Sequence, residues 1–193
     1  TRQRLLECTL AMLDTASYRD LKVVDIAREA GTSPATFYQY FTDIDAAIAE
    51  LAGDMAADGA TRLGGLLEGT RWSGEDAEAS VRMLVTGFLD FWDANRPLMR
   101  VIDLKAAEGE GRIRSTRKDL LAGFSNGLAE CVQRKSLPDA PANPWAMASV
   151  AVTMLVNVAI QREIFAASEI PDEDMIDAVA RLLLAAVTGT TTG

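Results

Sequence analysis

The sequence contains no histidine among its 193 residues and only two cysteines, Cys8 and Cys131. The absence of histidine removes the commonest general base and the commonest transition-metal ligand. The two cysteines lie far apart and lack the spacing of a metal site, so we expect them to be small buried side chains. Free cysteines of this kind favour a cytoplasmic location. No metal and no cofactor are expected.

The patterns that mark common catalytic and membrane-spanning segments are also missing. The sequence has no GxSxG, Walker, Rossmann or HExxH pattern, and without histidine a catalytic dyad would need unusual lysine, tyrosine or carboxylate chemistry. The longest apolar stretch, from Trp145 to Ile160, is interrupted by Ser149, Thr153 and Asn157. We therefore expect neither an enzyme nor a membrane protein.

Positive charge is scarce, since 19 Lys and Arg side chains face 28 Asp and Glu side chains, and the net charge is −9. This balance counts against nucleic-acid binding, because affinity for a duplex comes largely from basic side chains on phosphates. Acidic residues also outnumber basic ones within residues 1–50, where the basic residues are Arg2, Arg4, Arg19, Lys22 and Arg28. DNA binding would therefore have to depend on a few well-placed hydrogen-bond donors and helix N-termini.

Helical periodicity is present nearly everywhere, and no stretch alternates as a strand does. The sequence predicts an all-α fold of about nine helices. The expected spans are 2–16, 23–30, 34–40, a fourth helix ending near 67, then 75–94, 97–107, 112–135, 144–167 and 172–188. Thr42 is the expected N-cap of the fourth helix, with Asp45 in the capping-box position. Residues 68–75 form a turn-rich break.

Residues 18–48 combine a helix, a glycine turn and a second helix at the spacing of a helix-turn-helix. Gly31 is expected to end one helix, while Ser33 caps the next and Pro34 occupies its first position. Phe37 and Phe41 lie four residues apart, so we expect both rings to be buried on one face of the short helix.

The burial of these two rings directs the other side chains of the short helix outward. The hydroxyls of Thr36, Tyr38 and Tyr40 suit phosphates, Gln39 suits an adenine edge, and Ala35 or Thr36 suits a thymine methyl. The predicted DNA-binding residues are Lys22, Ser33, Pro34, Ala35, Thr36, Tyr38, Gln39 and Tyr40. The alternative is a packed helical hairpin that has only a structural role and does not bind DNA.

The pattern D-I-A-x-x-A-G-x-S-x-x-T-F-Y-x-Y-F, at residues 25–41, resembles the signature of the tetracycline-repressor (TetR) family. The resemblance covers about residues 5–55, and the rest of the chain agrees in helix number and length. It implies a three-helix helix-turn-helix DNA-binding domain (1–45) and a helical ligand-binding and dimerisation domain (46–193). It also implies a homodimer that binds double-stranded DNA and usually represses until a small molecule binds.

Two positions depart from the family pattern. Lys22 stands where the family commonly has a capping Ser or Thr, and Ile44 stands where it often has a lysine that touches the DNA backbone. Together with the acidic balance, these departures leave open modest affinity, a basic arm before Thr1, or heavier use of Arg19, Lys22 and Tyr38. The alternative for the whole chain is a helical dimeric interaction or ligand-binding module that has lost DNA binding.

The segment 144–167 is apolar nearly all round, and 172–188 is similar. A helix with no polar face must be buried on both sides, one side in its own domain and the other against a second subunit. We therefore predict a homodimer through about 144–167 and 172–188, which is also how the TetR family dimerises. The alternative is an ordinary monomer core.

An apolar effector is predicted to bind among aromatic and methionine side chains of the second domain. The candidate residues are Phe88, Trp92, Met99, Leu121, Phe124, Leu128, Trp145, Met154, Asn157 and Gln161. Asn157 and Gln161 lie four apart, so they either contact a ligand or bond each other or the backbone. This region resembles the ethionamide-resistance-regulator subgroup, which implies a ligand-contacting asparagine at the position of Asn157.

The basic residues Arg112, Arg114, Arg117 and Lys118 begin the seventh helix. They either hold an acidic head group, such as a carboxylate or a coenzyme A phosphate, or form a solvated helix face. We expect effector binding to shift the sixth helix, which should abut the fourth, and so to move the recognition helices. In the DNA-bound dimer these helices should lie about 34–36 Å apart.

Overall fold

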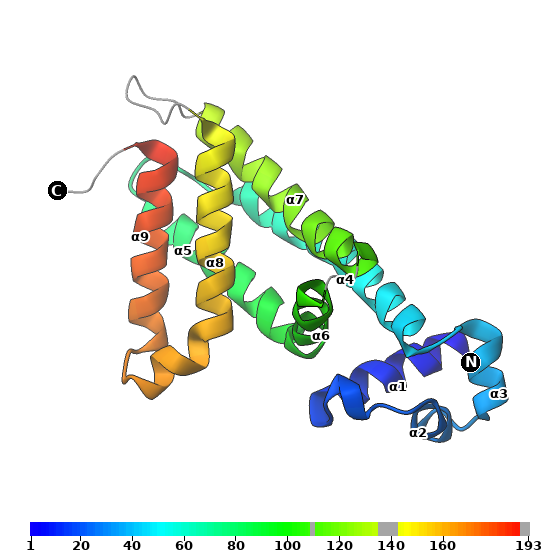
Figure 1. Ribbon diagram of the computed structural model, residues 1–193. Coiled ribbons are helices and arrows are strands. Elements are labelled where there is room, and N and C mark those ends of the chain that lie inside the picture. The colour runs from blue at the N-terminus through cyan, green and yellow to red at the C-terminus, as the bar shows by residue number, and fades with distance from the viewer. Residues whose placement is uncertain (109–110, 135–142, 190–193) are drawn as a thin grey trace. The chain divides into compact units, whose positions relative to one another are not determined.

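The regular structure of the protein is entirely helical in the part that the computed structural model describes. The described residues are 1–108, 111–134 and 143–189, without the side chains of 106–107 and 111–120. The elements are α1 (Arg2–Thr15), the 3-10 helix η1 (Tyr18–Asp20), α2 (Val23–Glu29), α3 (Pro34–Tyr40), α4 (Ile44–Gly69), α5 (Ala77–Ala94), α6 (Arg96–Ala107), α7 (Gly111–Arg134), α8 (Pro144–Ala167) and α9 (Asp172–Thr188) (Figure 1). The predicted all-α fold is confirmed, and each predicted helix agrees with an observed one to within a turn.

The prediction that Thr42 caps α4 is wrong. The backbone N–H of Ala46 donates a hydrogen bond to Asp43 Oδ1 at 2.7 Å. Asp43 directly precedes the first helical residue, which is the position from which a side chain reaches the free N–H groups of the first turn. Asp45, the residue expected in a capping box, is bonded to Tyr18 and Lys105 instead.

Contacts along the chain define two compact units. The first contains Thr1–Asp58 and Asn95–Asp119, and the second contains Gly59–Ala94 and Leu120–Gly193. The long helices α4 and α7 each contribute residues to both units. The predicted domain limits, 1–45 and 46–193, stay a prediction.

The core of the first unit joins α1, α2, α3 and the start of α4. Its buried cluster consists of Leu5, Leu6, Ile26, Ala30, Phe37, Phe41 and Ala47. Each large apolar side chain buried here contributes roughly 1.5–3 kcal/mol relative to its exposure to water. Helix α6 also packs against α1 within this unit. The core therefore fixes α3 against its neighbours through one face.

The turn between α2 and α3 is formed by Gly31 and by two backbone hydrogen bonds at the end of α2. Gly31 has a φ of 67°, a left-handed conformation that glycine adopts without steric cost. The Gly31 N–H donates to Arg28 O at 3.0 Å and the Thr32 N–H donates to Ala27 O at 2.8 Å, which is the Schellman arrangement at a helix end. The chain then turns directly into α3.

In the second unit, α5 packs against both α8 and α9, and α8 packs against α9. Helix α4 approaches α5 and α7 closely at two glycines. A Cβ atom added to Gly87 would lie 2.6 Å from Leu66 Cδ1, and one added to Gly127 would lie 2.9 Å from Leu67 Cδ1. The end of α4 is therefore in close contact with both neighbouring helices, and a larger side chain at either glycine would require these leucine side chains to shift.

Candidate nucleic-acid interface and effector region

Helix α3 is fixed by its capping residue and by two inward-facing rings. The Thr36 N–H donates to Ser33 Oγ at 3.2 Å, and Pro34 occupies the first turn. Phe37 is 0% exposed and Phe41 is 4% exposed, with their ring centroids 5.4 Å apart. The predicted burial of both phenylalanines is confirmed, and it orients the opposite face of the helix outward.

The predicted DNA-binding side chains lie on that outward surface. Tyr38 is 59% exposed and Tyr40 is 44% exposed. Lys22, Ser33, Pro34, Ala35 and Gln39 are also exposed, whereas Thr36 is half-buried. The Thr36 hydroxyl lies 3.0 Å from Ser33 Oγ, so these two hydroxyls meet at the beginning of α3. Their contact with DNA stays a prediction.

Lys22 occupies the N-cap position of α2 and makes no side-chain capping bond, as the sequence predicted. Its exposed ammonium group is therefore available to a phosphate. Ile44, which replaces the lysine common in the family, is half-buried and packs against the core cluster of the first unit. Position 44 therefore contributes an apolar contact to the core of the first unit.

A polar network that the sequence did not predict joins η1, α4 and α6 within the first unit. Lys105 of α6 donates to Asp45 Oδ2 at 2.7 Å, and the Tyr18 hydroxyl donates to Asp45 Oδ1. Lys105 Nζ also lies 4.7 Å from the centroid of the Tyr18 ring, and Lys105 is only 8% exposed. A lysine this buried requires such partners, because desolvation disfavours its charge.

The ionisation of Tyr18 and Asp45 is shifted by this network. Burial and the hydrogen bond to Asp45 raise the pKa of Tyr18 above its usual value of 10.0. Burial alone would raise the pKa of Asp45, but the hydrogen bonds from Lys105 and Tyr18 and the lysine charge outweigh it, so the pKa lies below 3.8. The network thus stabilises the ionised carboxylate of Asp45 at neutral pH.

Removing the carboxylate charge with Asp45→Asn is expected to lower the free energy of unfolding by about 1 kcal/mol at pH 7, a value reduced for the partial exposure of Asp45. Because the folded state depresses this pKa, the wild-type contribution is present above pH 3.8 and is lost as the pH falls through the lower folded value. Urea unfolding from pH 7 to pH 3 should therefore converge for the two proteins at acid pH.

Asp76→Asn provides the matched control, since Asp76 pairs with Arg71 where both side chains are about 70% exposed. Such exposed pairs contribute little, so this variant should unfold like the wild type at every pH. A constant difference between wild type and Asp45→Asn from pH 7 to pH 3 would contradict the assigned role of the charge.

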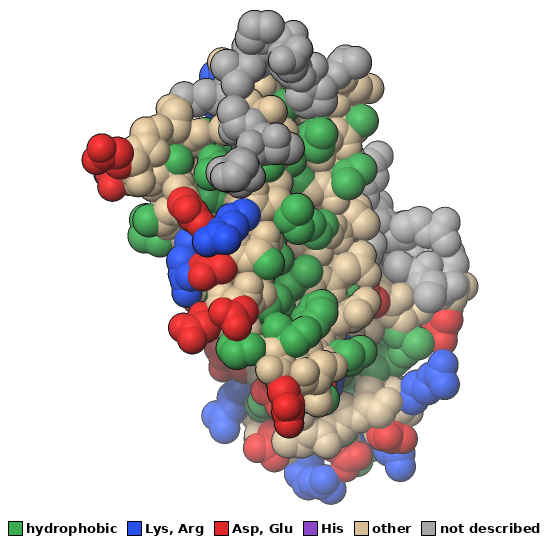
Figure 2. All heavy atoms as spheres, turned by 90° about the vertical axis from the view of Figure 1, so that its left-hand side faces the viewer, with side chains coloured by type: hydrophobic (Ala, Val, Ile, Leu, Met, Phe, Trp, Pro, Cys, Tyr) green, Lys and Arg blue, Asp and Glu red, His purple; other side chains and the backbone are tan. Residues whose placement is uncertain are grey.

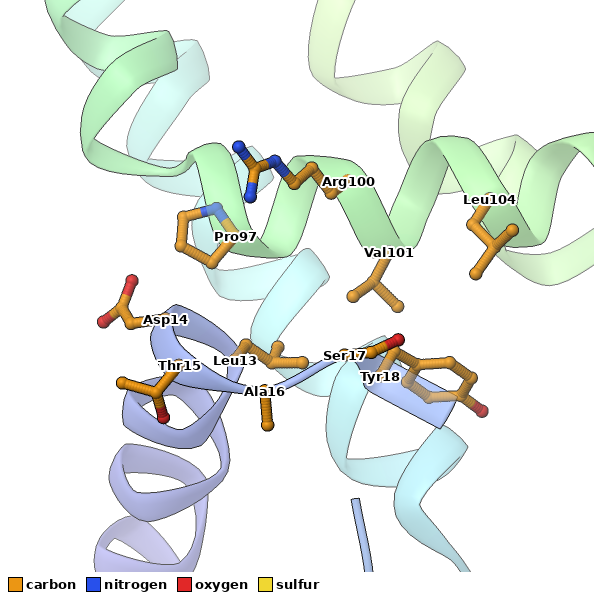
Figure 3. Close-up of a pocket in the computed structure, with 10 residues that line it drawn as sticks. All are labelled: Leu13, Asp14, Thr15, Ala16, Ser17, Tyr18, Pro97, Arg100, Val101 and Leu104. Carbon is orange, nitrogen blue, oxygen red and sulfur yellow. The ribbon is translucent and has the colours of Figure 1, made fainter. Parts of the chain in front are cut away.

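A pocket of about 360 Å³ separates part of α6 from the end of α1 in the same unit. In Figure 3, Pro97, Val101 and Leu104 extend from α6 toward Leu13 and the segment that follows α1. The remaining lining residues are Asp14, Thr15, Ala16, Ser17, Tyr18 and Arg100. The contact between α1 and α6 is therefore incompletely filled, which leaves space for a small displacement of α6.

The predicted effector-binding residues divide into three groups. Phe88, Trp92, Phe124 and Leu128 are buried in the second unit, where the Phe88 ring centroid lies 5.2 Å from that of Phe124 and 6.2 Å from that of Trp92. Leu121 and Met154 are half-buried, and Met99 is buried in the first unit. Trp145, Asn157 and Gln161 are exposed on α8.

The predicted role of Asn157 and Gln161 as ligand contacts stays a prediction. Asn157 Nδ2 donates to Thr153 O at 2.9 Å, which is the backbone alternative foreseen for this amide. The side of α8 that packs inside the unit is formed by Ala148, Ala151, Val152, Leu155, Val156 and Ala159. Asn157 and Gln161 are exposed and do not belong to this packed side.

The exposed side of α8 is a stripe of apolar residues. Val150 is 67% exposed, Ile160 48% and Ile164 61%, and Leu182 of α9 is 59% exposed. Figure 2 shows hydrophobic side chains in a band on the face that includes α9, with charged side chains along one edge. Such a stripe on two adjacent helices is the pattern of a helix–helix interface.

Within the described residues, α8 is the one helix whose length and mean hydropathy of 1.4 would allow it to cross a membrane. An apolar helix that packs on both sides in a water-soluble protein passes the same test. The described residues contain no group of three or more cysteine, aspartate or glutamate side chains placed to hold a metal ion.

A helix-turn-helix whose second helix buries two rings and exposes its polar side defines a DNA-binding protein of the helix-turn-helix class. Residues 5–51 match the family described as bacterial regulatory proteins, tetR family, and residues 63–192 match the tetracyclin repressor-like C-terminal domain. The chain belongs to the TetR family, whose members are DNA-binding transcription regulators that typically act as homodimers.

Solved structures share this fold at low sequence identity. A putative TetR-family regulator from Mesorhizobium loti is 17% identical, with a TM-score of 0.73 over 97% of this chain and 95% of that one. The fatty acid degradation regulator FadR from Bacillus halodurans is 16% identical, with a TM-score of 0.69 over 95% and 94%. FadR from Bacillus subtilis, solved with stearoyl-CoA, is 15% identical, with a TM-score of 0.64 over 99% and 100%.

Proposed function

We propose that this regulator is a cytoplasmic repressor that binds a pseudo-palindromic operator as a homodimer and is released by a small, largely apolar molecule. The observation that carries the DNA-binding part is the division of α3 into a buried face, with Phe37 and Phe41, and an exposed face, with Tyr38 and Gln39. The exposed face offers hydroxyl, amide and methyl groups, which suit a major groove. The chemistry is recognition and not catalysis.

The second subunit is proposed to cover the apolar stripe of α8 and α9. Val150, Thr153, Asn157, Ile160 and Ile164 recur at intervals of three and four along α8, and all five are exposed. This spacing places them on one side of the helix, as in helices that pack lengthwise. A two-fold axis through the stripe would pair α8 and α9 with their copies.

The double substitution Val150→Glu and Ile164→Glu is expected to convert the dimer to a monomer. Because the interface is symmetric, each introduced carboxylate would meet the apolar stripe of the partner and lie near its own copy. The dissociation constant should rise by at least about 100-fold, given two buried charges per subunit. Light scattering during gel filtration measures the mass directly.

Val24→Glu is the control for that substitution, since Val24 is 58% exposed on α2, outside the stripe. The control should remain dimeric. If the double variant keeps the mass of the wild type, the interface does not lie on this side of α8.

The effector is proposed to act through α6, which Lys105 joins to α4 by its bond to Asp45 and to η1 by its contact with the Tyr18 ring. The space between α6 and α1 permits α6 to move, and the network would transmit that movement to the helices beside α3. A relative solved with stearoyl-CoA supports an apolar, acyl-type effector. The side chains of the basic group Arg112, Arg114, Arg117 and Lys118 lie outside the described residues.

A fluorescence-polarisation titration of DNA from the chain's own promoter region tests the proposal. We expect sequence-selective binding that weakens by about tenfold to 100-fold between 50 and 200 mM salt, because each of a few phosphate contacts releases counterions from the DNA. The competing proposal is a dimeric module that has lost DNA binding, and the net charge of −9 favours it. Binding that is equally weak on operator and random DNA would support that module and refute the repressor.

A further inference from the structure

A second pocket, of about 460 Å³, lies within the second unit at the end of α4. Its walls come from the last turn of α4, the connection to α5 and the last turn of α7. The lining residues are Leu67, Glu68, Thr70, Trp72, Cys131 and Arg134. Its volume lies in the range of pockets that hold small organic ligands.

Trp72 supplies an unused hydrogen-bond donor in this pocket wall. The residue is 4% exposed, and its Nε1 is a buried side-chain nitrogen with no hydrogen-bond partner among the described residues. Burying an N–H group without an acceptor is unfavourable, and most buried polar groups in proteins are paired. The Thr70 hydroxyl, in the same wall, already donates to Leu66 O at 2.6 Å.

Arg134 adds positive charge to the same pocket. One of its guanidinium nitrogens, Nη2, lies 3.6 Å from Cys131 Sγ, and no described carboxylate is within ion-pair distance of it. The carboxylate in the lining, that of Glu68, is exposed. A guanidinium group binds carboxylates through two parallel hydrogen bonds. Leu67, the Trp72 ring and Cys131 make the rest of the wall apolar.

We propose that this pocket binds the carboxylate of a small amphipathic acid, with Arg134 and the Trp72 indole N–H as donors and the apolar wall against its hydrocarbon body. The indole nitrogen is itself buried, so binding requires the ring to turn its N–H edge toward the pocket. Cys131 continues the side of α7 that carries Leu121, Phe124 and Leu128. The hydrocarbon body can follow that side toward the predicted effector region.

This pocket also gives a ligand direct access to α4. Leu67 lines it, and its Cδ1 atom lies only 2.9 Å from where a Cβ added to Gly127 would be, so Leu67 also contacts α7 closely. A ligand in this pocket would therefore contact the end of α4, a single helix that begins at Ile44 beside Asp45. The identification of the acid as the effector rests on the proposed ligand response, whereas the binding site itself does not.

Titration of the full chain with octanoate, octanamide and octanol, without DNA, tests the site. The indole N–H signals of Trp72, Trp92 and Trp145 are followed by NMR and assigned with Trp72→Phe. Octanoate should shift the Trp72 signal in a saturable manner and bind at least about tenfold more tightly than octanamide, as expected for a charged hydrogen-bonded pair. Arg134→Gln should remove that preference.

Arg71→Gln is the matched control, since Arg71 is exposed and pairs with Asp76 outside the pocket. It should leave the preference for octanoate unchanged. Equal affinity for octanoate and octanamide in the wild-type chain would overturn the proposal, as would an Arg134→Gln variant that keeps the preference. The comparison of octanoate with octanamide uses the wild-type chain, so it tests the proposal even if a variant does not fold. A negative result in this titration would refute the binding site without bearing on operator binding, because the experiment contains no DNA.

Discussion

Replacing Tyr38 and Gln39 together by alanine is expected to abolish selective operator binding without changing the dimer. Both side chains are exposed on α3, and neither belongs to the buried cluster that holds the helix in place. Each lost base or phosphate contact is worth about 1–3 kcal/mol, and a dimer loses each contact twice. The affinity for the operator should fall by at least about 100-fold, which fluorescence polarisation measures directly.

The unfolding midpoint and the mass of this double variant should equal those of the wild type, because exposed side chains contribute little to stability. Asn126→Ala serves as its control, since Asn126 is exposed on α7 and belongs to the second unit. That control should bind the operator normally. A double variant with wild-type affinity would show that the exposed side of α3 is not the DNA-reading surface.

The helix-turn-helix could be predicted because its signals are local. Gly31, Ser33 and Pro34 each act on backbone groups within a few residues, and the structure places each in its expected role. The spacing of Phe37 and Phe41 fixes the buried side of a helix only seven residues long. Neighbouring positions of the sequence therefore determine both the turn and the orientation of α3.

The network of Tyr18, Asp45 and Lys105 could not be predicted in the same way. Its members come from three elements that are distant in the sequence, and a tyrosine, an aspartate and a lysine are ordinary residues on helix surfaces. Asp45 in particular satisfied a local pattern, the capping box, and the sequence alone favoured that reading. Asp43 caps the helix instead. Asp45 is bonded to a tertiary partner, Lys105, and this bond determines the role of Asp45.

The two sides of α8 were ambiguous for a different reason. Apolar residues occur on nearly every side of this helix, so periodicity cannot tell which side faces its own unit. Asn157 and Gln161 stood out as polar exceptions, and a cavity and a subunit interface both explain polar exceptions in an apolar helix. The small residues Ala148, Ala151 and Ala159 on the packed side were the available signal, because close helix packing favours small side chains.

Removing the Phe37 ring tests the feature on which the DNA-reading surface depends. Phe37 is 0% exposed and packs against Phe41 and the α1–α2 core. Truncating a fully buried phenylalanine to alanine typically costs about 3–5 kcal/mol, through lost burial and the cavity left behind. This loss is a large share of the stability of an ordinary domain, about 5–15 kcal/mol. Phe37→Ala should therefore lower the urea midpoint sharply and eliminate operator binding.

Phe37→Leu is the graded companion, since it keeps most of the apolar volume and should cost less than about 1.5 kcal/mol. It should retain operator binding, because no Phe37 atom is predicted to touch DNA. The order wild type, Phe37→Leu, Phe37→Ala is then expected in both unfolding and DNA affinity. If Phe37→Ala were as stable as the wild type but failed to bind DNA, the ring would be a direct contact. The burial of Phe37 would then not be what orients the exposed, DNA-reading side chains of α3.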